Sequence, residues 1–490
     1  MEVGQSGGIQ TGLLQHMSEK EKKGPFEDPA LGPQFKSPQQ GAATTVWGAV
    51  SRALEGLGGV YLEVVQIAKA WDEEEGQWAP GYHKYLLEYV LNPKKASSRR
   101  LRTMAIDTPY ETLTPSFDFP TEDQQLWWHH IAPVFIKSMT DANYTSDAQH
   151  KQLTFFYRCV LPHLGQFPVN SGNKPSNQAY KSNLGPYGLP FEFSLNFPDP
   201  IVRYSYEPIG PRAGTMDDPF NVEQIWPALK ALLSFDESVD ATLFHELVDL
   251  LLLSKDDAKT LTSQPGFTPG GPARGQCQFG VDMQGDQPML KGYFFTAMKS
   301  LATGIRADKL ICDAIRAVDR GGQRSAPLAE LESYLQARAA EPESTFFTAY
   351  LGCDIVPPEQ ARLKVYGVDR EVTFERLIDL WTLGGRLPND VGGQAEGLRA
   401  LREMWDLLQI PSGIRDMKVD HLTLGEPPKS LLPFIVNYTL LPGSLHPVPQ
   451  LYLVPFGLPD VHIAAALTRF FERMGWDQIA KTYKQNIVSY

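Results

Sequence analysis

A basic residue, one spacer residue and then a tyrosine recur in widely separated segments of this chain of 490 residues. One segment reads Lys291-Gly-Tyr293, and another reads Lys364-Val-Tyr366, where Arg362 adds one further alternate position. Alternate side chains of a β-strand share a face, so each cation and its phenol project into the same space. We therefore expect these strands to line an interior that binds a multiply charged anion beside a carbocation.

The composition argues against several broad classes of protein. A formal net charge of -12 argues against nucleic acid as the main partner. No run of about 18 apolar residues occurs, which argues against a transmembrane helix, and no basic-then-apolar leader opens the chain. Four scattered cysteines without a Cys-x-x-Cys pair argue against a disulfide framework or a zinc site. We therefore expect a cytoplasmic protein that does not act at a membrane.

The sequence before residue 108 differs in kind from the remainder of the chain. Residues 1–23 are polar and glycine-rich, which is typical of disorder, and residues 89–107 form a basic linker. Between them, residues 24–88 contain Gln40–Trp47, Leu57–Glu63 and Ala79–Tyr82 and resemble the C-terminal tail of short-chain dehydrogenases. The chain has neither a glycine-rich dinucleotide turn after a strand nor a Tyr-x-x-x-Lys pair. We interpret residues 24–88 as the remnant of a fusion or of an incorrect gene prediction, without oxidoreductase activity.

From Pro109 onward, a unit of two helical stretches and two strands is expected to repeat. Helices are predicted at Glu122–Thr140, Ala148–Pro162, within Val222–Ser254, Met298–Val318, Leu328–Ala340, Thr373–Thr382 and Ala395–Leu408. Strands are predicted at Pro190–Phe197, Ile201–Glu207, Gln276–Met283, Met289–Phe295, Ser344–Ile355, Ala361–Tyr366, Leu432–Leu441 and Gln450–Pro455. Repeated ααββ units predict an α+β fold, in which helices ring an antiparallel β-barrel. Closure of such a barrel would remove exposed strand edges.

Five motifs in order give residues 108–490 a family resemblance. They are Leu189–Ser194, Val202–Ile209, Lys291–Phe295, Arg362–Tyr366 and Gln450–Tyr452, preceded by matches to the family's opening at Thr108–Thr112 and Leu126–Trp128. These motifs resemble the fungal aromatic prenyltransferases of the dimethylallyltryptophan synthase family. The resemblance implies the barrel of that family and transfer of a dimethylallyl group from its diphosphate to an electron-rich aromatic acceptor. It implies an indole- or tryptophan-derived acceptor, fungal alkaloid biosynthesis and no cofactor.

Several alternatives stay open at this level. A phenolic or polyketide acceptor would suit the same chemistry, and a truncated, non-catalytic product belongs to a different class altogether. The number of subunits is also open, including a homodimer.

The donor site is expected to neutralise the diphosphate without a metal ion. No Asp-Asp-x-x-Asp motif occurs, because Asp217-Asp218 and Asp256-Asp257 lack the second half, and His129-His130 lacks companions at ligand spacing. Cationic side chains can supply the charge instead, while tyrosines donate hydrogen bonds and present π faces to the allyl cation. The residues predicted to bind the prenyl diphosphate are Arg203, Lys291, Tyr293, Arg362, Lys364, Tyr366, Gln450 and Tyr452.

Glu192 is the predicted catalytic and acceptor-binding residue. It stands between Phe191 and Phe193 in an apolar strand, where an unpaired carboxylate is costly and needs a partner. The resemblance assigns the N–H of an indole to it, and a phenol could use the same group. An ion pair with Arg203 across the hairpin is the alternative.

Two departures from the family pattern affect the details. Where members that prenylate C4 of tryptophan carry a lysine, this chain has Gln278, which cannot accept a proton. We therefore expect another acceptor or another ring position. The fifth repeat supplies helices around Asp460–Met474 and Trp476–Ser489 but no strand pair, so we expect an open sheet edge and a wetter pocket.

Overall fold

The computed structural model describes residues 62–63, 66–67, 71–72, 77–78, 108–168, 180–184, 188–269, 274–388, 394–415, 432–455 and 458–488. The chain divides into two compact units, Met1–Ile106 and Asp107–Tyr490. In the first unit it describes the two-residue strands β1 (Leu62–Glu63), β2 (Gln66–Ile67), β3 (Trp71–Asp72) and β4 (Gln77–Trp78), which form two antiparallel pairs. The predictions for residues 1–23 and 89–107, and most of that for residues 24–88, lie outside the described residues.

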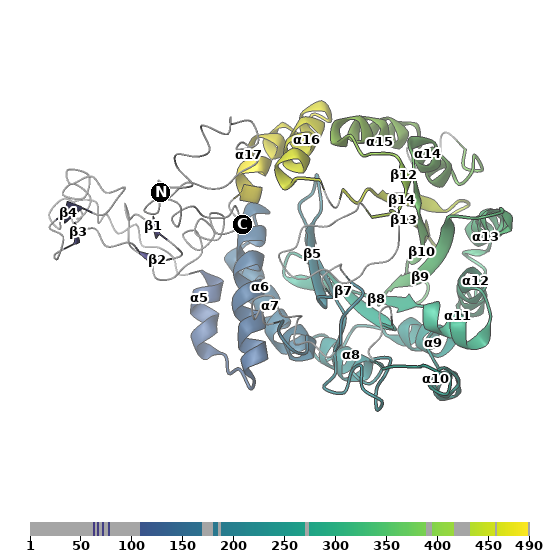
Figure 1. Ribbon diagram of the computed structural model, residues 1–490, viewed down its shortest axis with the longest axis horizontal. Coiled ribbons are helices and arrows are strands. Elements are labelled where there is room, and N and C mark those ends of the chain that lie inside the picture. The colour runs from purple at the N-terminus through teal and green to yellow at the C-terminus, as the bar shows by residue number, and fades with distance from the viewer. Residues whose placement is uncertain are drawn as a thin grey trace, which may run out of the picture. The chain divides into compact units, whose positions relative to one another are not determined.

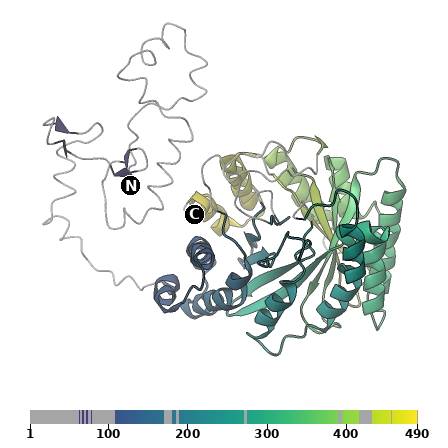
Figure 2. The same cartoon turned by 60° about the horizontal axis from the view of Figure 1, so that its bottom comes forward.

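An eight-stranded antiparallel sheet organises the second unit, with each strand hydrogen-bonded to the next one of the sheet along the chain. Figures 1 and 2 show that it curls into a half-barrel. The strands are β5 (Phe191–Leu195), β6 (Val202–Tyr206), β7 (Cys277–Gln284), β8 (Gln287–Phe295), β9 (Phe346–Asp354), β10 (Leu363–Asp369), β13 (Phe434–Leu440) and β14 (Val448–Tyr452). A short separate pair is formed by β11 (Glu371–Val372) and β12 (Gly413–Ile414).

Helices line the convex side of this sheet (Figure 1). They are α5 (Pro109–Leu113), α6 (Glu122–Asp141), α7 (Ser146–Phe155), α8 (Ile225–Leu233), α9 (Thr242–Leu251), α10 (Lys255–Thr262), α11 (Ala297–Thr303), α12 (Ala307–Val318), α13 (Ser325–Ala340), α14 (Phe374–Thr382), α15 (Gln394–Leu408), α16 (Asp460–Arg473) and α17 (Asp477–Val488). Helix α7 continues through a π-helical turn, Phe156–Val160, into a 3₁₀ turn, Leu161–His163. The predicted ααββ order is confirmed; α5, α10 and the β11–β12 pair were not predicted.

Local sequence explains why these helices begin and how they face the sheet. The Thr121 side chain accepts a hydrogen bond from the Gln124 backbone N–H at the start of α6, and acidic residues occupy the first turn. Buried residues of α6 recur three and four positions apart, including Trp128, Ile131 and Phe135. The apolar stripe of each such helix packs against the outer face of the sheet, where Tyr204, Val281 and Leu363 are buried. This outer layer forms one continuous hydrophobic core.

The two end strands of the sheet, β5 and β14, do not pair with each other, and among the described strands each pairs with one neighbour alone, β6 and β13, respectively. Beyond β14, helices α15, α16 and α17 continue the ring of helices (Figure 1). Phe197, at the end of β5, packs against Phe471 of α16 and Tyr483 of α17, with ring centroids 5.2 and 5.8 Å apart. Aromatic contacts between helices and the β5 turn therefore bridge the two ends where strand pairing does not.

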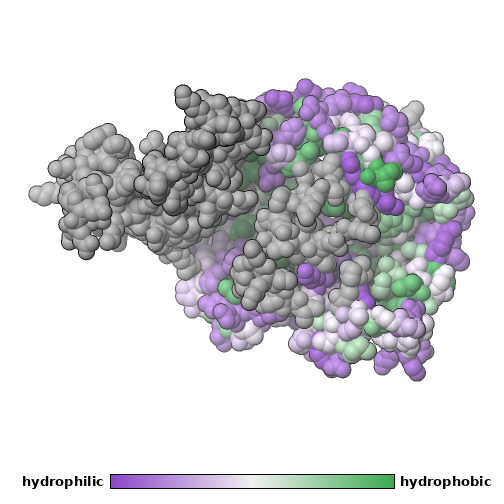
Figure 3. Space-filling view, viewed as in Figure 1, coloured by the Kyte–Doolittle hydropathy of each residue, from purple (hydrophilic) through white to green (hydrophobic). Residues whose placement is uncertain are grey.

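The outer surface is mainly hydrophilic, with scattered apolar side chains, in the parts of Figure 3 that are not grey. Within the described ranges, no helix combines the length and the apolar character needed to cross a bilayer.

Candidate active site

Strand register places the predicted site residues on the concave face of the sheet. Directly paired residues in an antiparallel sheet project to the same side. One row across the strands contains Glu192, Ser205, Gly280, Lys291 and Asp354. The next row contains Gln278, Tyr293, Gly352, Lys364 and Thr439, and a third contains Tyr350, Tyr366, Asn437 and Gln450. We call this set of rows the inner face.

Two aspartates hold three of the predicted cations in place. The Lys291 Nζ donates to both carboxylate oxygens of Asp282 at 2.6 Å, and the Arg203 Nε lies 3.4 Å from the same group. Arg362 makes a two-pronged contact with Asp354, from Nε at 2.6 Å and from Nη2 at 2.9 Å. Such paired contacts fix a side chain more tightly than a single hydrogen bond does. The cations are therefore pre-positioned, and part of their charge is already compensated.

Lys364 differs from these three cations. None of the described carboxylates forms an ion pair with its Nζ. Burial lowers the pKa of Lys364 to about 8, and the neighbouring charges of Lys291 and Arg362 act in the same direction. An anion bound here would relieve this electrostatic repulsion. Lys364 is thus the strongest candidate for contact with a phosphate group.

Four tyrosines share the inner face with Lys364. The rings of Tyr350 and Tyr366 are stacked, with centroids 4.2 Å apart, and Tyr293 meets both of them edge-on at 6.1 Å. The Tyr452 ring lies 6.3 Å from that of Tyr366. Burial raises the pKa of each of these phenols, so all four remain neutral hydrogen-bond donors. Their rings provide π faces on which a carbocation can be stabilised.

Two glycines create the space that the Tyr293 ring occupies. A Cβ added at Gly280 would lie 2.9 Å from the Tyr293 Cε2, and one added at Gly352 would lie 3.0 Å from its Cδ1. Both distances are shorter than carbon atoms tolerate without displacement. The ring of Tyr293 therefore lies over the backbone of the strands on both sides of it.

An amide network orients the residues of the last strand. Asn437 Nδ2 donates to Gln450 Oε1 and to the Tyr452 hydroxyl, both at 3.0 Å, while Thr439 Oγ1 donates to Asn437 Oδ1. Because the Gln450 oxygen is used, its Nε2 is the group left to donate to an anion.

Glu192 lies on the inner face of β5, where its side chain is reached by solvent. Protein atoms nevertheless surround it, and this burial raises the pKa of Glu192 to about 7. Its charge also acts on Tyr293, Tyr350 and Tyr452, so these residues share one chamber. The alternative ion pair with Arg203 is not formed: Arg203 lies opposite Ser194 in the register and pairs with Asp282.

The sequence profile described as tryptophan dimethylallyltransferase matches residues 123–486. The chain belongs to this family. It is a prenyltransferase, as the sequence motifs predicted.

Named relatives cover most of the prenyltransferase unit. The chain is 46% identical to prenyltransferase criF of Aspergillus cristatus over 78% of this chain and 91% of that protein. It is 40% identical to a tryptophan dimethylallyltransferase of Arthroderma otae over 78% and 83%, respectively.

Solved structures agree with the fold. The crystal structure of AnaPT from Neosartorya fischeri superposes with a TM-score of 0.68 and 30% identity, over 77% of this chain and 88% of that one. NotF, solved in complex with brevianamide F and DMSPP, superposes with a TM-score of 0.65 and 29% identity, over 78% and 89%.

The structure brings all nine predicted site residues of the prenyltransferase to one face, but it also adds residues that were not predicted. These are Asp282, Asp354, Tyr350, Asn437 and Thr439. Tyr350 escapes the basic-x-tyrosine pattern because Thr348, two positions before it, is not basic. The two aspartates could have been found as alternate-position partners of basic residues on neighbouring strands.

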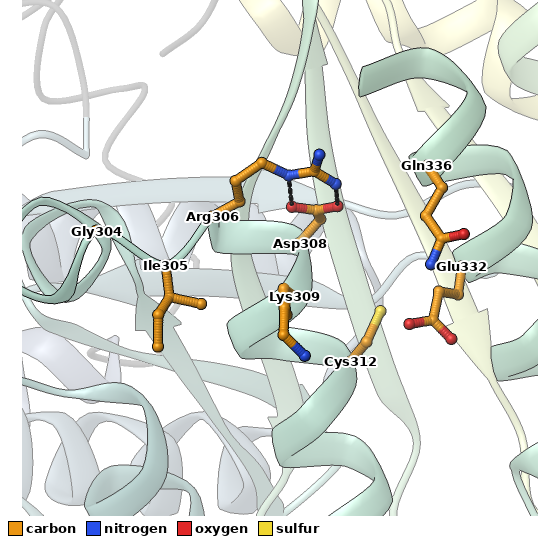
Figure 4. Close-up of a pocket in the computed structure, with 8 residues that line it drawn as sticks. All are labelled: Gly304, Ile305, Arg306, Asp308, Lys309, Cys312, Glu332 and Gln336. Carbon is orange, nitrogen blue, oxygen red and sulfur yellow. Dashed lines mark hydrogen bonds and ion pairs between the residues drawn. The ribbon is translucent and has the colours of Figure 1, made fainter. Parts of the chain in front are cut away.

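A separate cavity lies in the outer helical layer (Figure 4). Its volume is about 580 Å³, and it is lined by Gly304, Ile305, Arg306, Asp308, Lys309, Cys312, Glu332 and Gln336. Its charged groups are already engaged, for example Arg306 with Asp308 and Lys309 with Asp313. The inner face, and not this cavity, is therefore the candidate active site.

Proposed function

We propose that this prenyltransferase transfers a dimethylallyl group from dimethylallyl diphosphate to the aromatic ring of an indole- or tryptophan-derived acceptor, without a metal ion. The observation that carries the proposal is the division of the inner face. Lys364, with no carboxylate ion-pair partner among the described residues, shares the inner face with four tyrosines, and the Glu192 carboxylate acts on three of them, Tyr293, Tyr350 and Tyr452.

The donor binds where the positive charge is concentrated. As the allylic C–O bond breaks, its electron pair leaves with the diphosphate, and Lys364, Arg362 and Lys291 stabilise the developing charge. Gln450 Nε2 and the tyrosine hydroxyls donate hydrogen bonds to the same group. The tyrosine rings stabilise the allyl cation, at about 1–2 kcal/mol for a desolvated contact, and exclude water that would quench it.

The acceptor binds on the Glu192 side. A carboxylate that accepts the indole N–H makes the ring a better nucleophile, because electron density shifts from nitrogen into the ring. A ring carbon then forms the new C–C bond with the cation and loses its proton, which restores aromaticity. The net products are prenylated indole, diphosphate and one proton.

Metal independence is part of the proposal. Among the described residues, no group of three or more His, Cys, Asp or Glu side chains could hold a metal ion. The two aspartates of the inner face are instead bound to cationic side chains.

The test is an assay of the full chain with dimethylallyl diphosphate and a panel of indole, tryptophan, a tryptophan-containing cyclic dipeptide and a naphthol. Mass spectrometry identifies any product, and NMR assigns the bond formed. We expect prenylated indoles. Prenylation of the naphthol alone would show that the acceptor is a phenol and not an indole. Donor hydrolysis without any prenylated product would contradict the proposal.

A further inference from the structure

A buried carboxylate, Glu207, lies just beyond the C-terminal end of β6 and takes no part in the reaction described above. Only 1% of the residue is exposed. It accepts hydrogen bonds from the Tyr180 hydroxyl at 2.6 Å, the Ser182 hydroxyl at 2.5 Å and the Asn221 amide at 3.2 Å. We call these four residues the Glu207 cluster.

The donors of the Glu207 cluster are neutral. Burial raises the pKa of Glu207, and the surrounding hydrogen bonds oppose that shift. None of the described lysines or arginines forms an ion pair with this carboxylate. Burying a carboxylate without a cation costs more than burying a neutral side chain. Packing alone therefore does not explain why a glutamate occupies this position.

The position of the cluster connects it to the inner face. Glu207 continues the alternation of Arg203 and Ser205, and its neighbour Tyr206 pairs with Phe279 of β7. Continuing this register by one position places Glu207 opposite Gln278, which itself pairs with Tyr293 of β8. The cluster thus lies at one end of the same row that contains Tyr293 and Lys364.

The segment at residues 180–184 links the carboxylate to Gln278. The Ser182 hydroxyl donates to Glu207 and accepts from the Leu184 backbone N–H at 3.1 Å, which fixes the chain on either side of Asn183. The Asn183 backbone also bonds to Glu207. The Asn183 side chain then accepts a hydrogen bond from Gln278 Nε2 at 2.9 Å.

Gly275 shows how closely these groups are packed. A Cβ added at this glycine would lie 2.8 Å from Glu207 Oε1 and 3.1 Å from Asn183 Oδ1. The two oxygens therefore meet the same short stretch of backbone just before β7. Any larger residue at position 275 would displace one of them.

From this arrangement we infer that Glu207 is a positioning residue for the acceptor, acting through Ser182 and Asn183 on Gln278. The inference rests on the proposed function and refines the class of acceptor. The bond from Gln278 Nε2 to Asn183 uses one of its two N–H groups and fixes the orientation of the amide, and we assign its Oε1 as the group that accepts a hydrogen bond from the substrate. Glu192 and Gln278 then both accept hydrogen bonds. The site suits an aromatic acceptor that carries a second N–H donor besides that of the indole.

The test compares Asn183→Ala with Lys181→Ala, which changes the same segment outside the hydrogen-bond cluster. Steady-state kinetics use dimethylallyl diphosphate with two acceptors: 3-methylindole, which lacks a second donor, and a tryptophan-containing cyclic dipeptide, which has amide N–H groups. We expect Asn183→Ala to raise KM for the cyclic dipeptide about tenfold, which corresponds to one lost hydrogen bond. KM for 3-methylindole and for the donor should stay within about twofold, as should all constants of Lys181→Ala.

Gly275→Ala provides a second variant that disturbs the same contacts without removing a polar group, and it should show the same substrate-dependent change. A purely structural cluster would give equal changes for both acceptors and for the donor, or no change in folded protein. Either result overturns the inference while leaving the proposed function intact. A parent chain that prenylates neither acceptor overturns the proposed function and the inference together.

Discussion

The inner face divides into two halves that solve different electrostatic problems. In the half formed by β8 to β14, cations and tyrosines gather, and Asp354 holds Arg362 by two hydrogen bonds. In the half formed by β5 to β7, Asp282 compensates the charge of Arg203, Glu192 has no ion-pair partner among the described residues, and the Gln278 amide is fixed by a neutral neighbour. The first half is built to receive a negative leaving group, and the second to orient a neutral ring. Substitutions in the two halves should therefore change different kinetic constants.

Replacing Glu192 should have the largest effect. Glu192→Gln keeps the shape of the side chain but removes the charge that polarises the indole N–H, so kcat should fall about 100-fold or more. KM for dimethylallyl diphosphate should change little, since the donor binds in the other half. Steady-state kinetics with each substrate varied in turn measure both constants. Ser194→Ala, at the next alternate position on β5, is the control. An equal fall in kcat for that variant would contradict the assignment of Glu192 to the acceptor.

Replacing Lys364 should mainly affect the donor. Loss of a charge-assisted contact to an anion typically costs about 1.5–3 kcal/mol, so KM for dimethylallyl diphosphate should rise roughly tenfold to a hundredfold in Lys364→Ala. Lys364→Arg should retain most of the affinity because it retains the charge. Lys309→Ala, in the outer cavity, serves as the surface control. A larger change in the acceptor KM than in the donor KM would show that the halves are assigned the wrong way round.

The pH dependence of the kinetic constants should distinguish the two halves, because each half contributes one limb of the pH profile. The raised pKa of Glu192, about 7, means that the carboxylate is lost by protonation as the pH falls, so turnover should decline below pH 7. The lowered pKa of Lys364, about 8, means that its charge is lost as the pH rises, so KM for the donor should increase above pH 8. Each limb should approach a tenfold change per pH unit. Glu192→Gln should remove the acid limb alone, and Lys364→Arg should move the alkaline limb upward; a profile unaltered by both variants would reject this assignment.

Removing metal ions should have the smallest effect. The donor half neutralises diphosphate with side chains, so dialysis against excess EDTA should change the rate by less than about twofold. The assay is repeated with added Mg²⁺ as the control. A complete loss of activity that Mg²⁺ restores would show that the cations of the inner face are insufficient.

The sequence predicted the two halves unequally, for physical reasons. Strand alternation is local, so Lys291, Tyr293, Lys364 and Tyr366 could be assigned to one face from spacing alone. Register between strands is not local, and it decides that Arg203 meets Asp282 and not Glu192. Tyr350 was missed because no basic residue precedes it at the alternate position, and only its pairing with Tyr366 across the strands places it on this face.

The acceptor half depended even more on long-range contacts. Glu207 and Gln278 are separated along the chain, and Asn183 lies in a segment without regular secondary structure. No periodic pattern marks such a cluster, so only the folded chain shows it. The open pairing between β5 and β14 was predicted from the absence of a fifth strand pair in the sequence, but the bridge from Phe197 to α16 and α17 was not.

The most direct test of the two-half inner face is a crystal structure of the full chain with the unreactive thiolo analogue of dimethylallyl diphosphate and a bound indole acceptor. We predict that the diphosphate contacts Lys364 with Arg362 or Lys291, that the allyl group lies against the Tyr293 and Tyr366 rings, and that the indole N–H donates to Glu192. A diphosphate bound through a metal ion near Glu192, or an indole lying on the Lys364 side, would contradict the account.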